Sequence, residues 1–241
     1  MHYHWHWDVL LQQPYSTWLL DGFLVTIALS LIGWAIAIVL GTLVGAIRTA
    51  SSPTMRAAGA LYVRVFRNIP LLLQMFLWFF VLPEILPDAA GHFLKRDLPY
   101  PEFTTAALCL GCYTASRVAE IVRAGILSAG TGQRIAALAS GMSTLQAYRY
   151  VLLPLAFRLT VPPLVSEFLS VFKNSSVALT IGVFELTNQA NQIENYTFQG
   201  FEAYTAATAL YAAISFVCLR GTRLLSRHAS VGGMISAGAA P

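Results

Sequence analysis

The chain has 241 residues, of which 56% are hydrophobic and only 11% are charged. A soluble domain of this length carries roughly 25% charged residues, so the composition excludes an ordinary soluble protein and indicates an integral membrane protein. The net charge of +4 comes from dispersed basic residues beside apolar runs, which argues against a nucleic-acid-binding patch.

Residues 1–18 precede the first apolar run and are rich in aromatic side chains. This pattern is typical of an anchor at the membrane interface, and its members are Trp5, Trp7, Tyr15 and Trp18. The segment lacks the basic start and short apolar core of a cleavable signal peptide. We therefore interpret it as an interfacial segment outside the bilayer.

Two patterns leave a metal site open. His2, His4 and His6 alternate near the N-terminus, and Cys109 and Cys112 have CxxC spacing. We favour the simpler interpretation for both: the histidines accompany the aromatic anchor, and the cysteines are small residues one helical turn apart. We expect neither a metal ion nor a cofactor.

The first two spanning helices follow in order. Phe23–Ile47 is apolar and uncharged, and its 25 residues, at about 1.5 Å each, exceed the ~30 Å hydrocarbon core. Gly41 and Gly45 have the small-xxx-small spacing that permits close helix packing. A second helix is expected over about 57–82, with a kink at Pro70.

The third helix is expected over about 103–127, after an external loop with four prolines over 83–102. Arg117, Glu120 and Arg123 lie in its last third. Their i, i+3, i+6 spacing predicts one shared face.

A compact helical element is predicted over Gly132–Pro154, which is too polar to cross a bilayer. The fourth spanning helix then runs from Leu152 to about Phe184, with a break near Pro162 and Pro163. The stretch 185–201 is expected to be a loop. A fifth helix covers about 202–219, and the small, polar end of the chain is expected to be disordered.

Charges inside the fourth helix need partners or water. A charge at the bilayer centre costs at least ~2.5–3.5 kcal/mol, so Glu167 and Lys173 should not face lipid. Two interpretations stay open. They pair with each other or with Arg117 or Glu120, or they line a transport path.

Basic residues predict how the five helices are oriented. Arginines follow the first helix, separate the third from the fourth, and follow the fifth, whereas the alternate loops lack a basic excess. The N-terminus is therefore expected outside and the C-terminus inside. This gives an interfacial segment over 1–18, a transmembrane domain over 19–222 and a cytoplasmic tail over 223–241.

Four motifs resemble a known family. AALASGMSTLQAYRYVLLPLA is similar to the EAA loop of bacterial ABC-importer permeases, with Gly141 and Val151–Pro154 at its fixed points. FRNIPLLLQ, EIVRAG and the segment from Pro162 to Leu186 resemble, in order, FRGTPLLVQ, EIxRGG and PPxxNxFxxLxKxTSLxxxIGVxEL of the polar-amino-acid subfamily. The N-terminal WxWxxxLQQ and TASRVAE resemble its glutamate/aspartate branch.

The resemblance implies an all-α membrane protein with the type I ABC-importer permease fold, called MetI-like. It also implies a coupling helix in the cytoplasm that docks in a groove of an ATPase subunit. Ile135 stands where the family has Glu, and Leu138 where it usually has Arg. The expected coupling residues are Ala136, Ala137, Leu138, Ala139, Ser140, Gly141 and Met142.

The same resemblance implies partners and a location. The chain has no GxxxxGK[ST] motif, so ATP must bind to a separate cytoplasmic subunit. A second permease subunit, identical or not, a periplasmic substrate-binding protein and the lipid bilayer are the other expected partners. The expected location is the bacterial inner membrane, and the chain is not expected to be an enzyme.

Candidate substrate-path residues are Arg117, Gln74, Glu167, Lys173 and Asn174. Arg117 could receive a substrate carboxylate with bidentate geometry, which would favour glutamate or aspartate. Alternatively, it pairs with Glu120 or Glu167. Residues that match family motifs and are expected to be structural are Arg67, Pro70, Glu120, Arg123 and Pro154.

Two other functions remain to be weighed. A carrier driven by a gradient would use Glu167 and Lys173 as coupling groups, but five helices without an inverted repeat argue against it. A membrane enzyme is disfavoured because no nucleophile–base pair or metal triad emerges from the sequence.

Overall fold

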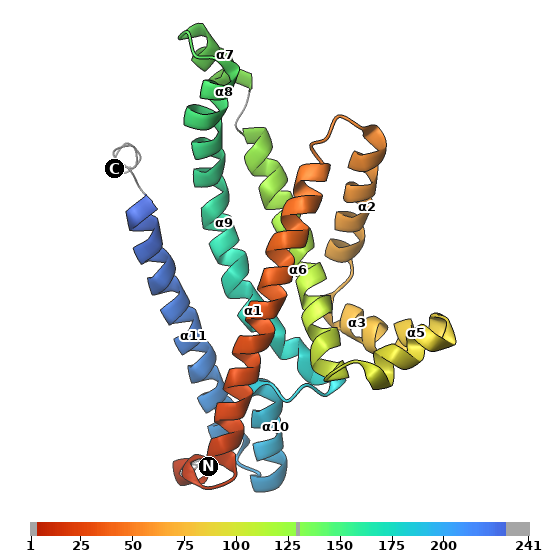
Figure 1. The fold of residues 1–241 in the computed structure, drawn as a ribbon. Coiled ribbons are helices and arrows are strands. Elements are labelled where there is room, and N and C mark those ends of the chain that lie inside the picture. Colours follow the sequence, from red (N-terminus) through yellow and green to blue (C-terminus); the bar gives the residue numbers. More distant parts are fainter. Residues whose placement is uncertain (1–3, 129–130, 230–241) are drawn as a thin grey trace.

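The computed structural model describes residues 4–128 and 131–229, and this part of the chain contains helices and no strand. Its long helices run along one another between two ends of the molecule (Figure 1). These helices are α1 (Tyr15–Ile47), α6 (Pro101–Ser128), α9 (Leu153–Asn174) and α11 (Gly200–Ala229). We name the two ends after the short helices that lie there, α7 (Thr131–Ala139) and α10 (Leu186–Thr197).

The contact between α1 and α6 is the most extensive in the molecule, and glycines make it possible. A Cβ atom added to Gly41 would lie 2.6 Å from Cβ of Val118, and one added to Gly45 would lie 2.9 Å from the Ala119 carbonyl oxygen. The small-xxx-small pattern therefore does what the sequence predicted, because it brings the backbones of two helices together.

The second predicted helix is divided into two parts at a sharp angle. Helix α2 (Pro53–Asn68) returns along α1, and α3 (Leu71–Phe76) with the continuation to Ile85 is turned by 104°. The expected kink at Pro70 is thus a complete break, since Ile69 and Pro70 both have extended backbone. Proline restricts the residue before it to such conformations.

The region expected as a proline-rich loop is mostly short helical pieces. They project sideways from the long helices (Figure 1). In chain order they are α4 (Leu82–Ile85), α5 (Asp88–His92) and η3 (Phe93–Asp97), and η2 (Leu77–Val81) precedes them at the end of the predicted second helix. A further short helix, η1 (Trp7–Leu11), precedes α1 at the α10 end.

The predicted break at the double proline is wrong. Helix α9 continues through Pro162 and Pro163, and together with α8 (Thr144–Ala147), η4 (Tyr148–Leu152) and η5 (Ser175–Ile181) it forms one 38-residue helical run. Each proline removes only its own N–H donor, and packing against α1 and α6 compensates for this loss.

The expected loop over 185–201 is also wrong, because most of it is α10. Leu186, Ala190 and Ile193 are fully buried at helical spacing against α1 and α11, while the polar residues lie between them. The last helix, α11, extends beyond the predicted Leu219 to Ala229, so the predicted boundary at 222 falls inside a helix. Two predictions fall on residues that the structure does not describe. They are the disorder of the chain beyond residue 229 and the position of His2.

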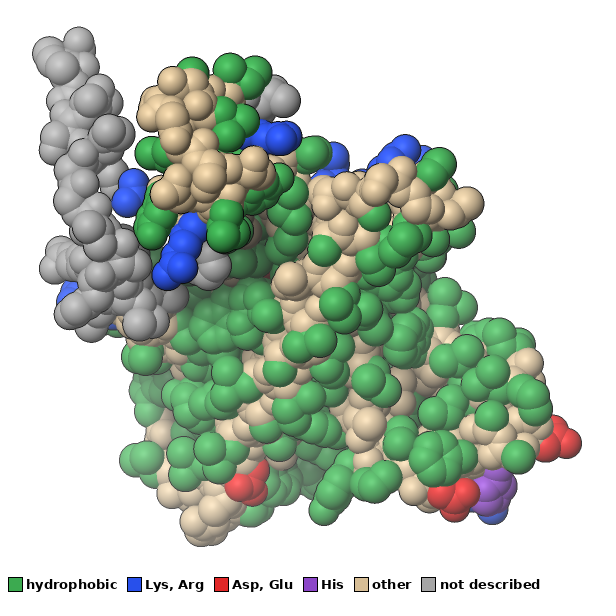
Figure 2. All heavy atoms as spheres, turned by 45° about the horizontal axis from the view of Figure 1, so that its top comes forward, with side chains coloured by type: hydrophobic (Ala, Val, Ile, Leu, Met, Phe, Trp, Pro, Cys, Tyr) green, Lys and Arg blue, Asp and Glu red, His purple; other side chains and the backbone are tan. Residues whose placement is uncertain are grey.

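Length and composition alone qualify three helical runs as membrane spans, or four if the bent α2–α3 pair is one span. Helix α6 is not among them, although its 28 residues correspond to about 42 Å. On the face shown in Figure 2, most of the visible Lys and Arg side chains lie toward one end, and the visible Asp, Glu and His side chains lie toward the other.

Candidate functional site

Three charged residues of α6 were expected to share a face, and the structure corrects this. Glu120 and Arg123 point to one side, toward α1 and α2, whereas Arg117 contacts Glu167 of α9. The reason is helical geometry, because 3.6 residues per turn places positions i and i+6 about 120° apart. The three residues therefore form two separate ion groups.

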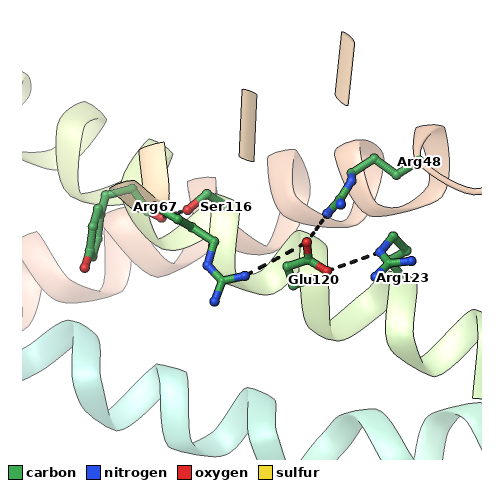
Figure 3. A network of polar contacts seen from close by, with 6 residues as sticks. Arg48, Arg67, Ser116, Glu120 and Arg123 are labelled. Carbon is green, nitrogen blue, oxygen red and sulfur yellow. Dashed lines mark hydrogen bonds and ion pairs between the residues drawn. The ribbon is translucent and has the colours of Figure 1, made fainter. Parts of the chain in front are cut away.

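The first group is the Glu120 cluster, formed by Glu120, Arg48, Arg67 and Arg123 (Figure 3). Oε1 of Glu120 lies 2.5 Å from an Arg48 guanidinium nitrogen and 3.9 Å from one of Arg67. Oε2 accepts a hydrogen bond from Arg123 Nε at 3.2 Å. One carboxylate thus joins α6 to α2 and to the end of α1, and the structural roles expected for Arg67, Glu120 and Arg123 stay predictions.

Arg48 is a member of this cluster that the sequence analysis missed. It follows the last residue of α1, where a basic residue is interpreted first as a topology signal. Its side chain is only 13% exposed. The EIVRAG motif gives Glu120 but not its partner 72 positions earlier, so this pairing could not be found without the fold.

The second group joins α6 to α9. Arg117 donates to Oε1 of Glu167 at 3.1 Å and to the Tyr113 hydroxyl at 3.3 Å, and its guanidinium lies 5.4 Å from the centre of the Tyr113 ring. The Arg117 side chain is 42% exposed, and that of Glu167 is 17% exposed. Of the alternatives left open by the sequence, Arg117 pairs with Glu167 and not with Glu120.

Gln74 was expected on the substrate path, but it is 3% exposed and supports the fold instead. Its Nε2 donates to the carbonyl oxygens of Phe66 and Ile69, each at 2.8 Å. These carbonyls belong to the break between α2 and α3, where the intrahelical donors are lost. Pro70 precedes α3 as its N-cap residue, so Pro70 and Gln74 together shape the 104° turn.

Lys173 and Asn174 lie at the end of α9. Lys173 is exposed and is about 9 Å along the helix from Glu167, and within residues 4–128 and 131–229 it makes no ion pair. Asn174 is half-buried. The structure therefore does not bring Lys173 to Arg117 or Glu167, and the amine stays available to groups outside this chain.

The predicted coupling element is a helical hairpin at the α7 end. Helix α7 ends at Ala139, and Gly141 takes a left-handed φ of +83°, which a residue with a side chain rarely adopts. Ser143 then caps α8, with a reciprocal hydrogen bond between Gln146 and the Ser143 backbone. Pro154 is the second residue of α9 and lies inside the continuous helical run from Thr144, two residues after the π-helical η4.

The exposed face of this hairpin differs from the predicted one. Ala137 is only 6% exposed and faces the rest of the chain, so it is not available to a partner. Leu138 and Met142 are exposed at 38% and 36%, as a docking surface needs, but Ile135 at 64% and Leu145 at 77% are more exposed. Sequence reasoning treated Ile135 only as a lost glutamate.

A buried acid at the α10 end was not anticipated. Glu185 is fully buried, caps α10 through hydrogen bonds from the Thr187 and Asn188 backbone, and accepts from the Tyr211 hydroxyl at 2.6 Å. Burial raises the pKa of the Glu185 carboxyl, and these hydrogen bonds oppose the rise. A glutamate before a helix with i, i+4, i+7 apolar spacing was the available signal.

A protein family described as "Binding-protein-dependent transport system inner membrane component" matches residues 37–231. The chain belongs to this family. It is 42% identical to the glutamate/aspartate import permease protein GltJ of Escherichia coli (strain K12), over 95% of this chain and 96% of that protein. It is 35% identical to the probable glutamine ABC transporter permease protein GlnP of Bacillus subtilis (strain 168), over 85% and 90%.

Solved structures agree in fold. A crystal structure described as an amino acid ABC transporter with histidines matches with a TM-score of 0.78 and 26% identity, over 94% of this chain and 100% of that one. An inward-facing methionine ABC transporter matches with a TM-score of 0.66 at 19% identity and supports the fold alone. The predicted all-helical, MetI-like fold is confirmed, while five crossings and the orientation stay predictions.

Membership settles the class of protein. The chain is the inner-membrane permease subunit of an ABC importer for polar amino acids and is not an enzyme. ATP hydrolysis belongs to a partner ATPase, and a second permease subunit and a substrate-binding protein complete such an importer. The alternative of a stand-alone, gradient-driven carrier is thereby set aside.

Proposed function

We propose that this permease imports acidic amino acids, with glutamate and aspartate as substrates. The observation that carries the proposal is that Arg117, bonded to Glu167 through one nitrogen, has a side chain that is 42% exposed. A carboxylate on the substrate side chain can accept the bidentate hydrogen bonds that a single Glu167 oxygen leaves unused. Glutamine has no such carboxylate and presents a neutral amide.

This substrate class is supported by a higher sequence identity to a glutamate/aspartate permease than to a glutamine permease. The glutamate/aspartate permease GltJ shares 42% of its residues with the chain, whereas the glutamine transport system permease protein GlnP of Escherichia coli (strain K12) shares 32% over 88% of the chain. Because glutamate and glutamine differ only at one terminal group, the side chain that receives this group decides the specificity.

The test is uptake by the reconstituted importer with its own binding protein and ATPase. Arg117→Met should lower glutamate uptake at least tenfold and leave the complex assembled, because Arg117 is half-exposed and its loss opens no cavity. Arg117→Lys is the matched control: it keeps the charge without the planar fork, so uptake should fall less. Unchanged glutamate uptake in Arg117→Met would remove Arg117 from the substrate path.

Lys173 and Asn174 are proposed as a second polar position on the same path. Their support is that Lys173 is exposed and makes no ion pair within the described residues, although it lies in a run that qualifies as a membrane span. A charge in such a run needs water or another chain. Gln74 is withdrawn from the path because its side-chain amide donates to two carbonyls at the α2–α3 break.

We also propose the orientation and the coupling role. The N-terminal segment 1–18 lies outside, residues 19–222 form the membrane domain, and the tail from 223 lies in the cytoplasm. The gathering of Lys and Arg toward one end supports this (Figure 2). The α7–α8 hairpin then faces the ATPase, with Ile135, Leu138, Met142 and Leu145 as its exposed apolar contacts.

The coupling role has its own matched pair of variants. A Cβ atom added to Gly141 or to Gly132 would meet no other atom within 4 Å, but only Gly141 has a left-handed φ. Gly141→Val should therefore abolish uptake while the ATPase still hydrolyses ATP, whereas Gly132→Val should retain most uptake. Equal uptake by the two variants would contradict a coupling role for the turn.

A further inference from the structure

A cavity of about 300 Å³ lies between the end of α1, helix α2 and helix α6. Its polar lining consists of Arg48, Arg64, Arg67, Asn68 and Glu120, and its apolar lining consists of Ala60 and Val63. It thus shares Arg48, Arg67 and Glu120 with the Glu120 cluster, and neither Arg117 nor Glu167 lines it. No step of amino-acid transport as proposed above uses it.

The cavity carries more positive charge than its own acid can balance. Three arginines and one glutamate line it, and Glu120 is already bonded to Arg48 and, from outside the lining, to Arg123. Arg67 remains 3.9 Å from that carboxylate with a half-exposed side chain. Arg64 is exposed and has no ion pair within residues 4–128 and 131–229. Two guanidinium groups are therefore left to bind an anion.

The packing of α1 on α6 determines where the cavity lies along the length of these helices. Gly45 lies against Ala119 and Val122, so Glu120 is level with the last turn of α1, which ends at Ile47. The cavity consequently lies at the boundary of the span that has Arg48 at its end. With the proposed orientation, this is the boundary facing the cytoplasm.

An exposed apolar surface lies directly beside the basic groups. Leu61 and Val65 of α2 are 61% and 43% exposed, and they are three positions before and one after Arg64 on the same helix. A charged hollow next to an apolar strip at a membrane boundary matches an amphiphile, with its anionic group in the hollow and its chains along the strip. A soluble anion would make no contact with this apolar strip.

We propose that this cavity binds the phosphate headgroup of an anionic phospholipid from the inner leaflet. Arg64 and Arg67 hold the phosphate oxygens through paired N–H donors, Asn68 supplies an amide donor, and the acyl chains lie along Leu61 and Val65. Arg48 stays bonded to Glu120 and fixes the wall. Only the choice of leaflet rests on the proposed orientation.

The test is lipid retention by the assembled importer, which does not depend on transport or on its substrate. The complex is purified in mild detergent, incubated with equal amounts of phosphatidylglycerol and phosphatidylcholine of the same acyl chains, and its bound lipid is counted by native mass spectrometry. Wild type should retain phosphatidylglycerol at least tenfold over phosphatidylcholine. Equal retention of the two lipids by wild type would overturn the proposal without any variant.

Variants locate the site. Arg64→Gln removes an exposed guanidinium that makes no ion pair with Glu120, and it should lower phosphatidylglycerol retention at least fivefold. Arg220→Gln is the matched control, because Arg220 is an exposed arginine on α11 that lies outside the cavity. The control should retain lipid like wild type. Equal losses in the two variants, or no loss in Arg64→Gln, would overturn the proposal.

A last arm separates the two sources of phosphate. Inorganic phosphate at about 10 mM should leave the bound phosphatidylglycerol unchanged, since the apolar strip adds to the affinity of the lipid. Displacement of the lipid by inorganic phosphate would overturn the lipid assignment in favour of a soluble anion. Raising the salt concentration should weaken retention in wild type more than in Arg64→Gln, because screening acts on the charge that the variant lacks.

Discussion

Two ion groups lie one turn apart on α6 and differ in almost every physical respect. Glu120 is one acid among three arginines that come from three parts of the chain, and its main partner Arg48 is nearly buried. Arg117 and Glu167 form a single pair between α6 and α9, and the arginine is 42% exposed. The first group holds helices together, and the second holds a charge where other molecules can reach it.

The difference indicates how charged groups in a membrane protein divide their roles. Removing the acid of the Glu120 cluster leaves several cations together with one of them buried, which is a costly arrangement. Removing Glu167 from the second pair leaves Arg117, whose side chain is 42% exposed, and this arrangement costs less. The following variants test this contrast, in order of the expected loss of stability.

Glu120→Ala should have the largest effect. It leaves the buried Arg48 beside two other arginines without an acid, and the expected loss of stability is about 3 kcal/mol. The measurement is the thermal midpoint of the detergent-solubilised complex. Glu120→Gln, which keeps the size and one acceptor oxygen, should lose less, and an unchanged midpoint in Glu120→Ala would show that the cluster does not hold α1, α2 and α6.

Arg48→Ala should come next. Glu120 keeps Arg123 as a partner, so the loss is that of one charged hydrogen bond plus packing of the arginine stem against Gly59, roughly 1–3 kcal/mol. The same thermal measurement applies. Arg48→Lys should recover part of the stability, and full stability of Arg48→Ala would mean that the 2.5 Å contact contributes nothing.

Glu167→Gln should separate stability from transport. Arg117 becomes an exposed cation with the Tyr113 hydroxyl still beside it, so the expected loss of stability is about 0–1 kcal/mol. Uptake should nevertheless change strongly, because Arg117 is no longer held toward α9. Thermal midpoint and glutamate uptake are measured on the same preparation, and parallel losses in both would make the pair structural like the Glu120 cluster.

Arg123→Ala should have the smallest effect. Its bond to Glu120 is an i, i+3 contact on one helix with a 35% exposed arginine, and such pairs contribute about 0.2–0.5 kcal/mol. A shift in the thermal midpoint as large as that of Arg48→Ala would show that the cluster depends on local pairing. In that case the comparison between buried and exposed partners would fail.

Several features of the fold follow from local sequence patterns and could be predicted from them. The glycines of α1 predicted close helix packing, which the structure places against α6, and Gly141, a fixed point of the resembling loop, forms the turn of the coupling hairpin. Where prediction failed, tertiary packing decided. Pro162 and Pro163 did not break α9, and the polar sequence of α10 hid three fully buried apolar residues at helical spacing.

The candidate site was predictable in part. Glu167 was named from its cost in a membrane, and Arg117 and Glu120 from their spacing and the family resemblance, but their partners depend on the direction of each side chain around α6. Gln74 shows the limit most clearly. Its polarity suggested a path, and only the carbonyls freed at the α2–α3 break show why a buried amide is needed there.

The helical run from Thr144 to Ile181 has a mechanical consequence. Its 38 residues form one continuous helical run of about 57 Å, which starts directly after the Gly141 turn and carries Glu167 and Lys173 far along its length. A displacement of the turn would therefore be transmitted along the helix and would move both side chains.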